Sequence, residues 1–84
     1  MQGWIAAARE ARGEISRLVL SGREQLILEG HSGLFSYDTK RIRIRTGEGM
    51  IEVTGQDLVI EYFGLRDLMI RGTIEGLRME GEMG

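Results

Sequence analysis

Short apolar segments in this chain alternate with glycine-containing breaks, and this pattern constrains the fold more than any other feature. Arginine and isoleucine alternate strictly over residues 41–45, and this two-residue spacing predicts a strand with one apolar and one charged face. The chain has 13 glycines and no proline, which favours many tight turns between short strands. We expect such turns at Gly30, Gly33, Gly55 and Gly72.

The same period continues along the chain and predicts about seven to eight short strands, a number typical of small rolled sheets. The apolar face of this sheet is expected to contain Ile42, Ile44, Ile51, Val53, Leu58, Ile60, Leu68, Ile70, Ile74, Leu77 and Met79. Polar residues occupy the alternate positions, so one face should be wet and the other covered. We predict a mainly β fold, a small rolled antiparallel sheet or meander. A faint similarity between residues 53–60 and 70–79 leaves a β-solenoid-like stack as the alternative.

A different period precedes the strands. Trp4, Ala8, Ala11 and Ile15 recur at spacings of three and four, which is the apolar stripe of an amphipathic helix. We therefore expect one N-terminal helix before the sheet. At 84 residues the chain fits a single domain, with an N-terminal helical segment over residues 1–16 and a β-rich body over residues 17–84.

Residues that carry enzyme or metal chemistry are sparse. The chain has no cysteine and one histidine, His31, so no thiolate nucleophile or histidine–cysteine metal site is expected. Ser32 and Ser36 are near His31 only in sequence, and its place between Gly30 and Gly33 favours hydrogen bonding within a turn. No glycine-rich phosphate loop occurs, and the carboxylates are dispersed. We expect no enzyme activity, cofactor or metal.

Basic residues are concentrated in the middle of the chain. Arg41, Arg43 and Arg45 should share one strand face, where they could contact anionic lipid or phosphate. The alternative is a solvated face paired with Glu52 and Glu61 on neighbouring strands, which the acidic second half of the chain favours. Few aromatic residues interleave these arginines, so nucleic-acid binding is not expected.

Several apolar residues fall on the side expected to be wet. They are Val59, Tyr62, Phe63 and Met69. Exposed apolar residues on a sheet often mark a contact surface, and unprotected edge strands invite pairing. This group is therefore a candidate surface for a protein partner or for a homo-oligomer. The longest apolar run, residues 4–8, is far shorter than the ~20 residues of a membrane span, so we expect a soluble, cytoplasmic protein.

A group of short motifs covers residues 26–79. The most specific block runs from Val53 to Ile60, with the sequence Val-Thr-Gly-Gln-Asp-Leu-Val-Ile. The others are the run from Leu26 to His31, Gly33, Tyr37, the run from Arg41 to Ile44, Gly49, Ile51, Ile70, Gly72 and Ile74. Together these motifs resemble the YabP/YqfC family of endospore-forming bacteria, and its YqfC branch in particular. The family usually has prolines before the first strand and between the last strands, and this chain has none.

The resemblance implies a role in the mother cell during endospore formation, with no enzymatic activity. YqfC-type proteins are typically encoded beside a larger membrane protein, YqfD, which makes a YqfD-like protein the natural partner. The expected function is that of a non-catalytic structural or adaptor protein, in the cytoplasm or peripheral at a membrane. The alternative is a peripheral lipid-binding module that uses Arg41, Arg43 and Arg45.

Overall fold

The computed structural model describes residues 17–81, and these form one antiparallel sheet with the order β1-β2-β6-β5-β4-β3. The strands are β1 (Arg17–Ser21), β2 (Gln25–Glu29), β3 (His31–Asp38), β4 (Arg41–Thr46), β5 (Gly49–Phe63) and β6 (Asp67–Gly81). Each strand pairs antiparallel with its neighbours in the sheet.

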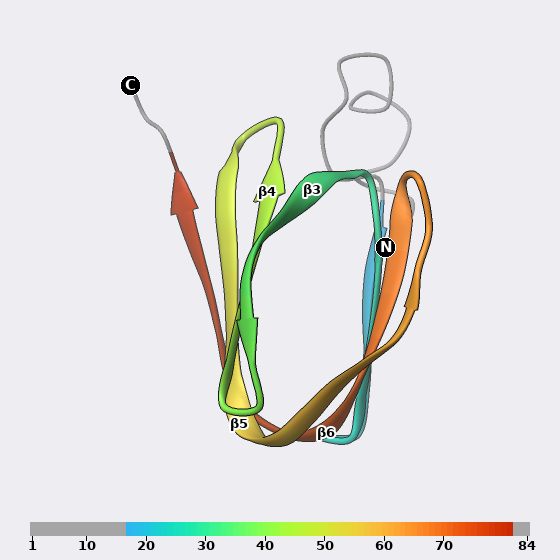
Figure 1. Ribbon diagram of the computed structural model, residues 1–84, viewed down its shortest axis with the longest axis vertical. Coiled ribbons are helices and arrows are strands. Elements are labelled where there is room, and N and C mark those ends of the chain that lie inside the picture. The colour runs from blue at the N-terminus through green and yellow to red at the C-terminus, as the bar shows by residue number, and fades with distance from the viewer. Residues whose placement is uncertain (1–16, 82–84) are drawn as a thin grey trace.

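The two longest strands bend sharply and fold the sheet over on itself. β5 and β6 each have 15 residues. Figure 1 shows that each of them bends at the bottom of the molecule, so that the first part of the strand faces its last part. We call the part built from β3, β4, residues 49–54 of β5 and residues 76–81 of β6 the β4 half. The part built from β1, β2, residues 67–71 of β6 and residues 59–63 of β5 is the β2 half.

The bend coincides with irregular pairing between β5 and β6. The register shifts between Thr54 and Gly55 and again between Gln56 and Val59, and Asp57 has a positive φ of 54°. Extra residues of this kind bend a strand and increase its twist. A side chain at Gly55 would collide with the backbone carbonyl of Thr73, so only glycine lets the two strands approach this closely.

Two hairpin turns hold the bend in place. Backbone carbonyls of the β3–β4 turn accept hydrogen bonds from β5, with Leu58 N to Thr39 O at 2.8 Å and Gly55 N to Lys40 O at 3.1 Å. On the other side, Ile74 N donates to Arg23 O at 2.7 Å in the β1–β2 turn. The backbone groups that the bulges free from the ladder are thereby satisfied, which buried polar groups require.

The hydrophobic core lies between the two halves. It consists of Leu26, Leu28, Ile42, Ile44, Ile51, Val53, Leu58, Leu68, Ile70 and Ile74, all at most 4% exposed. Leu18 and Ile60 pack against it while partly buried. Each half contributes the apolar face of its strands, so one sheet makes both walls of the core.

The predicted fold class needs correction, because the described residues are all β and contain six strands instead of seven or eight. The predicted number is too high because the turns expected at Gly55 and Gly72 do not end a strand, and β5 and β6 each continue over 15 residues. Antiparallel pairing also rules out the solenoid-like stack over residues 17–81. The expected helix over residues 1–16 lies outside the described residues. The single-domain assignment stays a prediction.

Two residues expected in the core are exposed at its margin. Leu77 and Met79 pair with Val53 and Ile51 and so face the core side, yet they are 39% and 54% exposed. The reason is that β2 pairs with β6 only from Asp67 to Arg71. The N–H groups of Gly72 and Ile74 still donate to the β1–β2 turn, but no described strand lies beside residues 76–81 on this edge of β6.

The glycines expected at turns have different positions. Gly30 lies between β2 and β3 with a φ of 109°. Gly33, Gly55 and Gly72 lie inside β3, β5 and β6 rather than between strands, where they accompany shifts of register. Gly72 has a φ of 142° and packs so closely on Asp57 that an added Cβ would lie 2.6 Å from the Asp57 carbonyl oxygen. In this chain glycine therefore marks bends within strands as well as turns.

Candidate functional site

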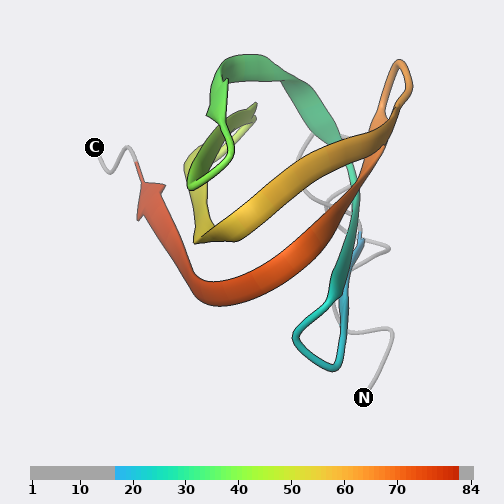
Figure 2. The same ribbon diagram turned by 60° about the horizontal axis from the view of Figure 1, so that its bottom comes forward.

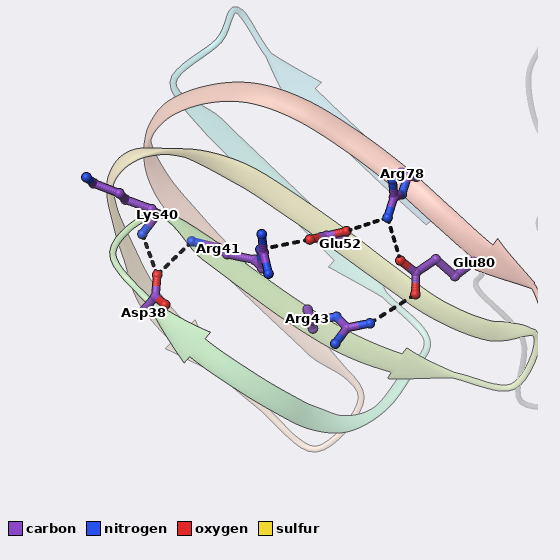
Figure 3. A network of polar contacts seen from close by, with 7 residues as sticks. All are labelled: Asp38, Lys40, Arg41, Arg43, Glu52, Arg78 and Glu80. Atoms are coloured by element: carbon purple, nitrogen blue, oxygen red, sulfur yellow. Dashed lines mark hydrogen bonds and ion pairs between the residues drawn. The ribbon is translucent and has the colours of Figure 1, made fainter.

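The outer face of the β4 half carries a network of ion pairs. Arg43 of β4 lies opposite Glu52 of β5, and Glu52 lies opposite Arg78 of β6. Glu52 is only 7% exposed and accepts from Arg41 Nε at 2.9 Å and from Arg78 at 3.1 Å. Figure 3 shows its carboxylate between these two guanidinium groups. Arg41 thus pairs with a carboxylate on the neighbouring strand, as one of the two interpretations of the β4 arginines expected.

Glu80 of β6 connects Arg43 of β4 to the network. Its carboxylate accepts from Arg78 at 3.0 Å and from Arg43 at 3.1 Å (Figure 3). The hydrogen bond from Arg78, followed by that from Arg43, holds the pKa of Glu80 below its ordinary value. Glu61, the other acid expected to pair with β4, instead bonds Arg71 at 3.0 Å.

The arginines of β4 also contact an aromatic ring. The guanidinium groups of Arg45 and Arg43 lie 4.9 and 5.4 Å from the centre of the Phe35 ring on β3, which is within the range of cation–π attraction. Arg43 Nε is buried without a hydrogen-bond partner among the described residues. Arg41 and Arg43 are thus engaged by carboxylates, and an anionic ligand would have to compete with Glu52 and Glu80.

The outer face of the β2 half is chemically different. Val19, Ile27, Met69 and Tyr62 lie directly opposite one another along β1, β2, β6 and β5. Directly opposite residues share a face, and Ile27 and Met69 each lie between two core residues, so this face is the one away from the core. We call these four residues the apolar row.

The apolar row has polar neighbours on both sides. One flanking row contains the ion pair between Arg17 and Glu29 at 3.7 Å. The other contains Gln25, whose side-chain amide lies 3.3 Å from the Met69 sulfur, and Arg71. Tyr62 is 51% exposed, whereas Val19, Ile27 and Met69 are half-buried. An apolar patch with a polar rim is a common form of protein-binding surface.

The four apolar residues singled out in the sequence fall in two places. Tyr62 and Met69 lie in the apolar row, and Val59 lies next to it opposite Arg71. Phe63 lies opposite the core residue Leu68 and therefore faces the other way. Its ring stacks on His31 at 4.9 Å between centroids. Val19 and Ile27 were missed because each stands inside a fully apolar segment, where alternation gives no signal.

His31 closes the β2–β3 connection. It is 4% exposed, its Nδ1 accepts from Gly33 N at 3.0 Å, and its Nε2 lies 3.0 Å from Gly64 O. Both contacts are satisfied when Nε2 carries the proton and donates to Gly64. Gly30 N and His31 N also donate to Arg66 O. The histidine thus ties the start of β3 to the β5–β6 loop, and Ser32 and Ser36 are not among its hydrogen-bond partners.

Two further observations concern the part of the chain from Arg17 to Gly81. No three His, Cys, Asp or Glu residues there are grouped so that they could hold a metal ion. That part also has no helix of the length and apolarity that a membrane span needs.

The fold and its two outer faces define a small antiparallel β-roll protein with a charged and an apolar surface. The profile of the YabP family matches residues 12–84, and the chain belongs to this family. It is 24% identical over 82 residues to the uncharacterized protein YqfC of Bacillus subtilis (strain 168), covering 93% of this chain and 88% of that protein. Membership fits a sporulation-related protein and agrees with the resemblance found in the sequence.

Proposed function

We propose that this protein is a non-catalytic adaptor of endospore formation that binds another protein through the apolar row. The observation that carries the proposal is the contrast between the two outer faces. On the β4 half, Arg41, Arg43 and Arg78 pair with carboxylates within the sheet. The β2 half instead leaves Val19, Ile27, Met69 and Tyr62 aligned on its surface. The contact residues of protein interfaces are enriched in Tyr and Met.

The partner we propose is a membrane protein of the YqfD type, with the adaptor on the mother-cell side of the membrane. Family membership supports the setting, and the neutral chemistry of the apolar row supports a protein rather than a phosphate-bearing surface. Tyr62 would be the anchor of the contact, because it is the most exposed of the four residues and combines a large ring with a hydroxyl group.

Co-purification from sporulating cells tests this proposal. The tagged wild-type chain should retain the membrane protein encoded beside it in mild detergent, and Tyr62→Lys should reduce the yield at least tenfold, because burying an unpaired charge is costly. Leu65→Lys is the matched control, since Leu65 is 91% exposed in the β5–β6 loop and lies outside the apolar row. Equal loss with both variants, or none with either, would reject the apolar row as the binding surface.

Direct lipid binding is the second candidate, and the β4 arginines motivate it. In sedimentation with anionic vesicles it would appear as binding that falls with salt and with Arg45→Gln. We expect no such binding, since Glu52 and Glu80 already pair with Arg41 and Arg43. Sedimentation of the wild type that Arg45→Gln abolishes would favour the lipid module over the adaptor.

A further inference from the structure

The carboxyl-terminal part of β6 has one open edge within the described part of the chain. β2 pairs with β6 only as far as Arg71, and the N–H groups of Gly72 and Ile74 donate to the β1–β2 turn. From Gly76 to Gly81, β6 pairs with β5 on one side, and no described strand pairs with it on the other. Figures 1 and 2 show this end of β6 at the rim of the sheet.

The side chains at this edge suit further strand pairing. Leu77 and Met79 are 39% and 54% exposed on the core side, where a neighbouring strand would cover them. Arg78 and Glu80 alternate with them on the outer face, as their pairing with Glu52 and Met50 shows. Long edges without a bulge, a proline or an inward-facing charge are sites where a further strand can add. The chain contains no proline.

We propose that this edge of β6 pairs antiparallel with the same edge of a second copy, with Met79 opposite its own counterpart. Pairing through a two-fold axis uses the same surface on both copies. To keep both faces of the sheet continuous, core-side residues must lie opposite core-side residues. Centring the pair on Met79 places Arg78 of each copy opposite Glu80 of the other. Centring it on Arg78 or on Glu80 would place like charges opposite each other, which is unfavourable.

Charge alternation continues across this interface. Within one copy, a row of directly opposite residues runs from Arg43 through Glu52 to Arg78. In the proposed register the next member of that row is Glu80 of the second copy, so the signs alternate across four strands. On the core side, the two Met79 side chains meet and cover the margin that a single chain leaves exposed. This pairing is independent of the proposed partner, because it uses no residue of the apolar row.

A cysteine at the two-fold axis tests the register. The chain has no cysteine, so Met79→Cys introduces a single thiol, and opposite residues in antiparallel strands lie within the Cα distance of a disulfide. Mild oxidation of the full chain should convert most of Met79→Cys to a covalent dimer. Val59→Cys is the control, since Val59 is similarly exposed at 49% but lies on the outer face of the β2 half, and it should form no covalent dimer.

Sedimentation velocity provides the second measurement and needs no new bond. Wild type should dimerise, and Met79→Lys should weaken the association constant at least tenfold, while Leu65→Lys leaves it unchanged. A wild type that stays monomeric at roughly 100 μM, where even weak specific pairs associate, would overturn the proposal and indicate that another segment or another protein covers this edge. A dimer that persists in Met79→Lys, or that crosslinks equally through Val59→Cys, would overturn it as well.

Discussion

At the scale of single residues, His31 shows how a residue with catalytic potential serves the fold. Its two ring nitrogens contact backbone groups of Gly33 and Gly64, and its ring stacks on Phe63. A general base needs a free nitrogen near a nucleophile, and both nitrogens of His31 are taken. The sequence allowed this prediction because the flanking glycines indicated a turn. It could not reveal Phe63, which is distant along the chain.

Replacing His31 by alanine should destabilise the protein by about 2–3 kcal/mol, because two partly buried backbone groups lose their partners and the ring contact is lost. Urea unfolding followed by circular dichroism measures this difference. Ser32→Ala is the control, since Ser32 is exposed and should change stability by less than about 0.5 kcal/mol. Equal stabilities for His31→Ala and wild type would show that the histidine does not hold the β2–β3 connection.

Glu80 should titrate below its ordinary range, because Arg78 and Arg43 stabilise its charged form. A lowered folded-state pKa gives a stabilising contribution above the unfolded-state pKa that is lost as pH falls through the folded value. In Arg78→Gln the pKa of Glu80 should therefore rise toward its ordinary value. Carbon-13 NMR of the carboxyl group over an acidic pH series measures this change. An unchanged titration would mean that the Arg78–Glu80 bond does not form in solution.

At the scale of elements, the bend of β5 and β6 explains where sequence patterns succeed and fail. The strict alternation around Ile42 and Ile44 gave a strand and its buried face correctly. Gly55 was expected at a turn between strands, yet it lies within β5 beside the irregular pairing at Gln56 and Asp57. Turns and bulges use the same residue types because both need unusual backbone angles. Only the pairing of β5 with β6 distinguishes a bulge from a turn here, and the sequence of one strand alone does not specify that pairing.

Gly55→Ala should destabilise the protein by about 3 kcal/mol, because the added methyl group collides with the backbone of β6 at the bend. Gly76→Ala is the matched control on the facing strand. There the added atom meets only the Thr54 hydroxyl, at 2.7 Å, and this group can rotate away, so a cost nearer to about 1 kcal/mol is expected. Thermal unfolding of the two variants compares them directly. A smaller loss for Gly55→Ala than for Gly76→Ala would contradict the close approach at the bend.

At the scale of the whole molecule, folding one sheet over on itself creates two outer faces with different chemistry. Ion pairs join β4, β5 and β6 on one face, and the apolar row crosses four strands on the other. Alternation along single strands predicted that Tyr62 and Met69 are exposed apolar residues. It could not predict the apolar row, because the order β1-β2-β6-β5 joins strands that are far apart in the sequence. The open edge of β6 has a different cause, because β2 pairs with only residues 67–71 of this 15-residue strand.

The proposed adaptor function depends on binding of a protein partner by the apolar row. The most direct test adds the detergent-solubilised YqfD-type membrane protein to the isotope-labelled chain and follows its amide signals by NMR. We expect the signals of Val19, Ile27, Tyr62 and Met69 to broaden or shift first. Changes confined to Arg41, Arg43 and Arg45, or no change at saturating partner, would contradict the proposed function.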